Sequence, residues 1–187
     1  MAGSAREVGA QTSADVAATE LHSATPAGFD ALFDAHFARA VRLAWLLAPG
    51  DQGGAEDAAA DAIARVWPKW AKGRVEEFWP YLRLAVVNQV RGRGRRLAIA
   101  RRYEPIVGGA ATRADDFELA IVDRALLTDA LHALPDRQRT AVVLRFYEDL
   151  SEAECARVMG CSLGTVKSTT SRGLAALRAL LETSRDD

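Results

Sequence analysis

The side chains best suited to contact DNA are concentrated near the C-terminal end of this 187-residue chain. At 100° per residue, one face of residues 163–178 carries only small, hydroxyl and basic side chains, with no acid among them. Lysine and arginine can contact phosphates or guanine edges, and serine and threonine can bond to either. The side chains expected to do so are Ser162, Thr165, Lys167, Ser168, Ser171 and Arg172. A solvated helix of an all-α bundle can carry a similar face, so the flanking sequence has to discriminate between the two.

The residues around this face predict a short helix, a tight turn and a second helix. Ser151 and Glu154 stand at the spacing of a capping box, which marks the start of the first helix. Gly160 follows its last turn, where a left-handed residue is favoured, and Ser162 is a good N-cap for the second helix. The second helix is expected to pack through Leu163, Val166, Thr170, Leu174, Leu177 and Leu181. Together these signals predict a helix-turn-helix whose second helix enters the major groove.

A second candidate for nucleic-acid contact is residues 78–103, which contain seven arginines and no Asp or Glu. Aromatic rings interleaved with arginines suit single-stranded DNA, because bases stack on the rings while the cations follow the backbone. Arginine runs also occur on faces that meet only solvent. The tryptophans also have a simpler interpretation, as residues of the core or of the boundary between domains rather than as stacking surfaces for bases. They are Trp45, Trp67, Trp70 and Trp79.

Residues 134–172 resemble region 4, the promoter-reading domain of the extracytoplasmic-function sigma factors, which are the small group of the sigma-70 superfamily. The likeness rests on LPDRQR at 134–139, VLRFYEDLS at 143–151 and GTVKS at 164–168, and it is to the actinobacterial, sigma-E-like type. It implies a sigma factor rather than an enzyme, with the second helix reading the minus-35 duplex. Thr169 and Thr170 replace the arginine-leucine pair of many members, so base preference there is not carried over.

The resemblance also implies a second DNA-reading module upstream, region 2 of the family. Residues 29–47 have apolar side chains at helical spacing and look like its opening helix. Another helix is expected to start at residues 55–57, with acids in its first turn, and to end or bend at Pro68. By resemblance it grips the clamp helices of the largest polymerase subunit through Glu56, Asp57, Asp61 and Ile63.

The basic stretch is similar to the family's helix that captures extruded bases of the minus-10 element. This similarity implies that Asn88 and its neighbours hold the non-template strand. As in base flipping, contacts with the extruded bases would offset the free energy lost when the bases unstack. The expected contacts are Trp79, Tyr81, Arg83, Asn88, Arg91, Arg93, Arg95 and Arg96.

Helical periodicity predicts an all-α protein made of two small helical domains joined by a flexible linker. The expected order is a disordered tail at 1–25, region 2 at 26–103, a linker at 104–118 and region 4 at 119–187. The tail is rich in Ala, Ser, Thr and Gly without sustained periodicity, and the linker contains Pro105 and the Gly108-Gly109 pair.

The formal net charge of −1 is segregated, because the basic windows are nearly free of acids. Near-neutral total charge predicts weak binding of the isolated chain to DNA at physiological salt. The partners that the resemblance implies are core RNA polymerase, through its beta and beta-prime subunits, and promoter DNA in duplex and single-stranded form. It leaves open an anti-sigma protein as a further partner.

Several other classes of protein are disfavoured by the sequence. No apolar run approaches the ~20 residues that span a bilayer, and no secretory signal is seen, so a cytoplasmic protein without membrane contact is expected. Cys155 is expected in the core and Cys161 in the turn, and the three histidines are scattered, so neither a metal nor a cofactor is predicted. No phosphate-cradling loop or nucleophile–base pair suggests an enzyme. The alternative is a free-standing helix-turn-helix regulator that binds duplex DNA without polymerase.

Overall fold

The computed structural model describes residues 26–48, 52–103 and 120–186, with side chains described for 28–48, 52–94 and 125–184. In chain order the helices are α2 Pro26–Leu47, α3 Gln52–Trp70, α4 Phe78–Tyr103, α5 Ala120–Ala133, α6 Asp136–Val142, a π-helical turn η1 Val143–Tyr147, α7 Glu152–Met159 and α8 Leu163–Asp186. No strand occurs in these three ranges, which confirms the predicted all-α class. The predicted tail and linker lie outside the described residues.

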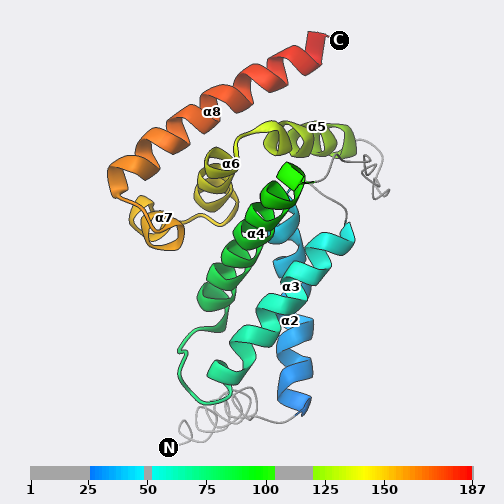
Figure 1. The fold of residues 1–187 in the computed structure, drawn as a ribbon, viewed down its shortest axis with the longest axis vertical. Helices are drawn as coiled ribbons and strands as arrows, with labels where there is room; N and C mark the ends of the chain where they lie inside the picture. Colours follow the sequence, from blue (N-terminus) through cyan, green and yellow to red (C-terminus); the bar gives the residue numbers. More distant parts are fainter. Residues whose placement is uncertain (1–25, 49–51, 104–119, 187) are drawn as a thin grey trace, which may run out of the picture.

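The first module consists of α2, α3 and α4, which pack against one another in pairs (Figure 1). Its core contains Leu43, Ile63 and Leu82, each at most 1 % exposed. Trp70 meets Phe78 edge-on, with 5.4 Å between the ring centroids, and so closes the end of the module where α3 turns into α4. Fully burying side chains of this size contributes ~1.5–3 kcal/mol each, so apolar packing holds the α4 surface in place.

Helix α3 differs from the prediction at both ends. It starts at Gln52, earlier than expected, and it continues through Pro68 to Trp70. Of the two outcomes predicted at Pro68, an end or a bend, the end is therefore wrong. Pro68 lies in the last turn, where its missing N–H removes only one hydrogen bond of the helix. The stop comes instead at Gly73, whose positive φ of 63° turns the chain while Arg74 N–H donates to the Lys69 carbonyl.

The second module consists of α5 to α8, and α8 packs against α5, α6 and α7 (Figure 1). The backbones of α8 and α6 approach closely at Gly173, where a Cβ would lie 2.8 Å from Val142 Cγ2 and 3.2 Å from the Gln138 carbonyl oxygen. Glycine therefore lets the backbone of α8 come nearer to α6 than any larger residue allows.

The two modules contact each other where α2 meets α5 and α6. The buried guanidinium of Arg139 donates to the Leu47 carbonyl at the end of α2, with 2.9 Å between Nε and O. It also bonds within its own module to the carbonyls of His132 and Leu134 and to the Asp136 carboxylate. Nε2 of His132 donates to the Trp45 carbonyl at 2.8 Å. These donors satisfy carbonyls in the last turn of α2, which have no partner within the helix itself.

Candidate nucleic-acid interface

The helix-turn-helix forms as the sequence predicts. Ser151 Oγ accepts from the Glu154 N–H at 3.3 Å while the Glu154 carboxylate accepts from the Ser151 N–H at 2.8 Å, a complete capping box for α7. Ser151 Oγ also donates to the Glu154 carboxylate at 2.6 Å, and this bond, together with the one from the Ser151 N–H, lowers the pKa of Glu154. Gly160 ends α7 with φ 63°, and Ser162 Oγ accepts from the Thr165 N–H at 3.2 Å to cap α8. The cap residues therefore fix the turn between the two helices.

Helix α8 presents the predicted DNA-contacting face to solvent. Ser162, Lys167, Ser168, Ser171 and Arg172 are exposed and Thr165 is half-buried. Val166 and Leu177 pack inward, as expected. Thr169 is also buried, whereas Thr170, the residue expected on this face, is half-buried. The prediction is wrong for Leu163, which is the first residue of α8 and is 45 % exposed.

In the free protein, local bonds hold the polar side chains of this face. Lys167 Nζ lies 3.6 Å from the carboxylate of Glu152 on α7. Ser168 Oγ donates to the Thr165 carbonyl, and Arg172 Nε donates to the Ser168 carbonyl at 3.1 Å. The Lys167–Glu152 pair is more than one-third exposed on both sides, so it contributes only ~0–1 kcal/mol and can exchange for a phosphate.

The residues of α4 predicted to contact single-stranded DNA differ in their exposure to solvent. Asn88 is exposed, Trp79 and Tyr81 are half-buried, and Arg83 is only 9 % exposed. The ring of Tyr81 is fixed by Lys69, whose Nζ donates to the Tyr81 hydroxyl at 2.8 Å. Arg95 and Arg96 belong to α4, but their side chains lie outside the described part of the chain.

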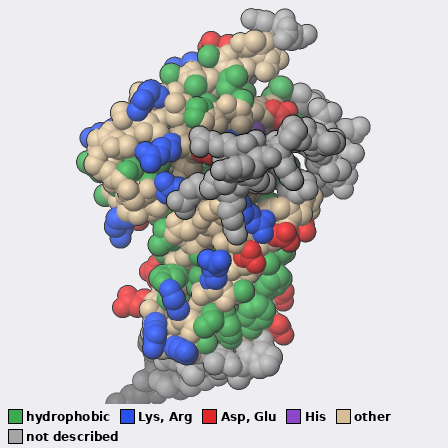
Figure 2. Space-filling view, viewed as in Figure 1, with side chains coloured by type: hydrophobic (Ala, Val, Ile, Leu, Met, Phe, Trp, Pro, Cys, Tyr) green, Lys and Arg blue, Asp and Glu red, His purple; other side chains and the backbone are tan. Residues whose placement is uncertain are grey.

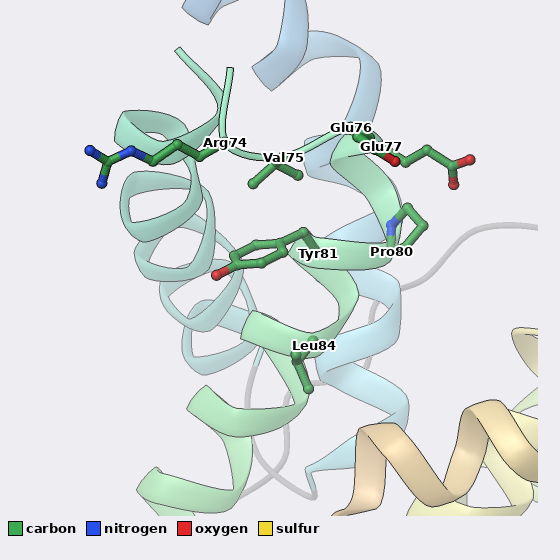
Figure 3. A pocket seen from close by; sticks show the side chains of 7 residues that line it. All are labelled: Arg74, Val75, Glu76, Glu77, Pro80, Tyr81 and Leu84. Carbon is green, nitrogen blue, oxygen red and sulfur yellow. The ribbon is translucent and has the colours of Figure 1, made fainter. Parts of the chain in front are cut away.

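A hollow of about 480 Å³ opens between the end of α3 and the start of α4 (Figure 3). Its lining comprises Arg74, Val75, Glu76, Glu77, Pro80, Tyr81 and Leu84. Figure 3 shows the Tyr81 ring among Val75, Pro80 and Leu84, while the Arg74 guanidinium and the Glu77 carboxylate point away from the ring. An aromatic wall next to a cation suits a flat base, whereas the two carboxylates oppose a phosphate at the same place.

Of the three acids predicted to meet polymerase, Asp57 and Asp61 pair with α4, whereas Glu56 accepts from Gln52 Nε2 at 2.9 Å within α3. Arg93 donates to the Gly54 carbonyl at 2.7 Å and lies 3.4 Å from the Asp61 carboxylate, and Gln89 donates to Asp61 at 2.6 Å. Asp57 lies 3.7 Å from Arg93. The side chains of Asp57 and Asp61 keep 74 % and 53 % exposure, so a partner can still reach them.

Ile63 does not fit the predicted polymerase surface. Its side chain is 1 % exposed and belongs to the core between α3 and its neighbours, so it has no area to offer a partner. It packs on the buried face of α3 together with Ala59, Ala62 and Val66, so packing rather than contact is its role.

Glu148, at the end of η1, joins the second module to α2 and α4. Its side chain is fully buried, and Oε2 accepts from Trp79 Nε1 at 3.0 Å and from Arg83 and Arg39 at 3.3 Å each. Arg91 adds a bond from Nη1 to the Met159 carbonyl at 3.1 Å. Three predicted minus-10 residues therefore contact the helix-turn-helix module.

Sequence reasoning missed this contact. Glu148 stands among acids in the sequence, but no pattern along the chain pairs it with Trp79, which lies 69 positions away.

Figure 2 shows Lys and Arg side chains at the surface of both modules, as the segregated charge of the sequence indicates. No helix in the described ranges combines the length and apolar character needed to cross a bilayer. Nor do the described side chains include a group of three or more potential ligands that could hold a metal ion.

Comparisons with known proteins agree with this architecture. Residues 124–177 match the family described as Sigma-70, region 4. The chain is 40 % identical to RNA polymerase sigma-E factor of Streptomyces antibioticus over 69 % of this chain and 71 % of that protein. It is 29 % identical to the ECF RNA polymerase sigma factor SigL of Mycobacterium tuberculosis, over 81 % and 88 % of the two chains. The sigma factor RpoE of Bartonella quintana, solved with the anti-sigma factor NepR, superimposes with a TM-score of 0.60 at 26 % identity, covering 83 % of this chain and 97 % of that one.

These similarities define a promoter-specificity subunit of RNA polymerase. The chain belongs to the sigma-70 family, in its extracytoplasmic-function group. Its function is therefore that of an RNA polymerase sigma factor, and the alternative of a regulator working without polymerase is not favoured.

Proposed function

We propose that this sigma factor reads the minus-35 duplex with the outer face of α8 and holds the opened minus-10 strand with α4. In this proposal residues 26–103 form region 2 and residues 119–187 form region 4, with a linker at 104–118 and a tail at 1–25. The observation that carries it is the exposed face of α8, where Lys167, Ser168, Ser171 and Arg172 lie away from the packed positions Val166, Thr169 and Leu177. Ser162 caps this helix and Thr165 lies at the edge of the face.

Contact with the minus-35 duplex needs side chains that can leave their present partners at small cost. Lys167 and Arg172 are exposed and make one local bond or ion pair each. An arginine or lysine that bonds bidentately to guanine discriminates by ~1–3 kcal/mol, while serine and threonine fix the position of the helix on the backbone.

Contact with the minus-10 strand is proposed for Tyr81 with its adjoining hollow, for Asn88 and for the arginines of α4. Stacking of a base on an aromatic ring contributes ~1–3 kcal/mol, and the hollow beside Tyr81 is large enough to admit a base. Arg95 and Arg96 extend the same helix and would follow the phosphates.

Contact with the beta-prime subunit is proposed for the exposed carboxylates of Glu56, Asp57 and Asp61 on α3. The nearby Arg93 competes for two of these acids, so a basic polymerase surface would release Arg93 towards DNA. The beta subunit is proposed as a further polymerase partner.

We infer a cytoplasmic, non-catalytic protein, because sigma factors act on RNA polymerase in that compartment. An anti-sigma protein is a further proposed partner, supported by the Bartonella quintana sigma factor, which was solved in complex with one.

The test is promoter-dependent transcription by the full chain and sigma-free core polymerase on a promoter library. We expect run-off transcripts from a subset of promoters sharing minus-35 and minus-10 elements. Absence of promoter-dependent transcripts, combined with tight polymerase-free binding to a palindromic duplex, would favour the free-standing regulator instead.

A further inference from the structure

Trp79, Arg83 and Arg39 all direct hydrogen-bond donors at a single carboxylate oxygen, Oε2 of Glu148. Arg39 also lies over the Trp79 ring, with 3.8 Å between the guanidinium carbon and the ring centroid. Two guanidiniums and an indole N–H around one anionic oxygen form the donor set that a DNA phosphate oxygen would otherwise use.

We propose that Glu148 is an internal competitor of DNA: in the free protein its carboxylate occupies the phosphate-binding donors of α4 and keeps the two modules docked. Promoter binding then requires the second module to move away from α4. This inference rests on the proposed assignment of Trp79, Arg83 and Arg91 to the minus-10 strand.

The contact is built so that it can open. The Glu148 side chain is fully buried, yet its second oxygen, Oε1, has no hydrogen-bond partner among the described residues, and neither has Arg83 Nε. A buried polar network that is only partly satisfied offsets much of its own attraction by desolvation. A phosphodiester offers the same donors a charged oxygen that remains in contact with water, so DNA held by polymerase can displace the carboxylate.

A second contact of the same kind supports the docked arrangement. Arg91 donates to the Met159 carbonyl at the end of α7, so the helix-turn-helix module uses a backbone oxygen as well as a carboxylate to engage cations of α4. When the modules separate, Trp79, Arg83 and Arg91 become available together, and opening one contact favours opening the other.

The experiment compares full-length wild type with Glu148→Gln, which keeps the shape of the side chain and removes its charge. The matched control is Glu182→Gln, an exposed glutamate of α8 in the same module whose substitution changes the net charge equally. Nitroxide labels at Lys72→Cys and Ala179→Cys, both exposed positions, report the distance between the modules by pulsed electron resonance in a Cys155→Ala, Cys161→Ser background. Fluorescence anisotropy with a labelled single-stranded oligonucleotide, without polymerase, reports access to α4.

We expect Glu148→Gln to lengthen and broaden the inter-label distance and to tighten oligonucleotide binding about tenfold, the effect of removing one hydrogen-bonded charged competitor. Glu182→Gln should leave the distance unchanged and alter binding by less than about twofold, because an exposed charge is screened. Arg39→Gln removes a charged donor of the same contact and should likewise lengthen the distance. It serves as the second variant if circular dichroism shows that Glu148→Gln fails to fold.

An unchanged distance in both Glu148→Gln and Arg39→Gln would overturn the docking role of Glu148. A longer distance without tighter oligonucleotide binding would overturn the competition with DNA. The proposed function is tested separately by Asn88→Ala in the polymerase complex. Loss of promoter opening in that variant, with unaltered oligonucleotide binding by Glu148→Gln, would leave the proposed function standing and remove this inference alone.

Discussion

At the scale of single residues, the backbone at Asp149 carries a cost that the sequence alone does not reveal. Asp149 is exposed and has φ 50°, in the left-handed region, between the buried residues Glu148 and Leu150. Aspartate tolerates this region better than most residues, but a side chain with a Cβ still costs free energy there. The turn before α7 is therefore held by its buried neighbours rather than by local preference.

Asp149→Gly should be more stable than Asp149→Ala by ~1 kcal/mol in the free energy of unfolding, because only glycine adopts positive φ without a steric cost. Denaturant titration of both variants measures the difference. The control is the exposed helical residue Ala175, where glycine should lower stability by ~1 kcal/mol. An Asp149→Gly protein less stable than Asp149→Ala would contradict this account of the turn.

Lys167→Ala should weaken binding of a minus-35 duplex by the polymerase complex and reduce the dependence of log K on log salt by ~0.9, the value for one lost phosphate contact. If Lys167 instead bonds to a base, discrimination at one position falls by ~1–3 kcal/mol. Arg178→Ala removes an exposed cation further along α8, outside the six predicted contacts, and is the matched control. Equal losses in the two variants would show general electrostatics rather than recognition.

At the scale of helices, most of the helix-turn-helix could be predicted from the sequence, because its signals are local. The capping box at Ser151, the left-handed Gly160 and the cap at Ser162 each depend on residues within a few positions of one another. The burial of Leu163 and an end of α3 at Pro68 were predicted wrongly, since periodicity does not reveal how much of a first turn is covered or how near a proline lies to the last turn. The contacts of Glu148 were beyond prediction because they join separate modules.

Gly173→Ala should destabilise the second module by ~1–3 kcal/mol, since the added methyl overlaps Val142 and the Gln138 carbonyl and forces α8 away from α6. Gly164→Ala is the control: a Cβ there meets nothing within 4 Å, and alanine favours helix by up to ~1 kcal/mol. Thermal unfolding of both variants distinguishes close helix packing from helix propensity. Similar melting temperatures for the two would argue against the close approach.

At the scale of the whole molecule, the docked modules share a titratable contact. Burial lowers the pKa of His132, whose neutral ring donates to the Trp45 carbonyl of the first module, and the charge of Arg139 lowers it further. Burial likewise lowers the pKa of His36 on α2. A histidine with a depressed pKa binds fewer protons in the folded than in the unfolded state, so its contribution to stability is lost as pH falls below ~6.5.

The free energy of unfolding should therefore decrease between pH 7 and pH 5. His132→Gln should make this decrease smaller, because one of the two histidines no longer titrates, and a remaining slope belongs to His36. Urea titrations at a series of pH values measure both slopes. A slope in His132→Gln equal to that of the wild type would show that His132 does not couple protonation to the docked fold.

The central claim is that α8 reads the minus-35 duplex and α4 holds the opened minus-10 strand. It is tested most directly by transcription from two forms of one promoter, a full duplex and a template with a pre-melted minus-10 element. Asn88→Ala should lose activity mainly on the duplex and recover most of it on the pre-melted template, whereas Lys167→Ala should be equally impaired on both. Equal impairment of Asn88→Ala on the two templates would contradict the assignment of α4 to the opened strand.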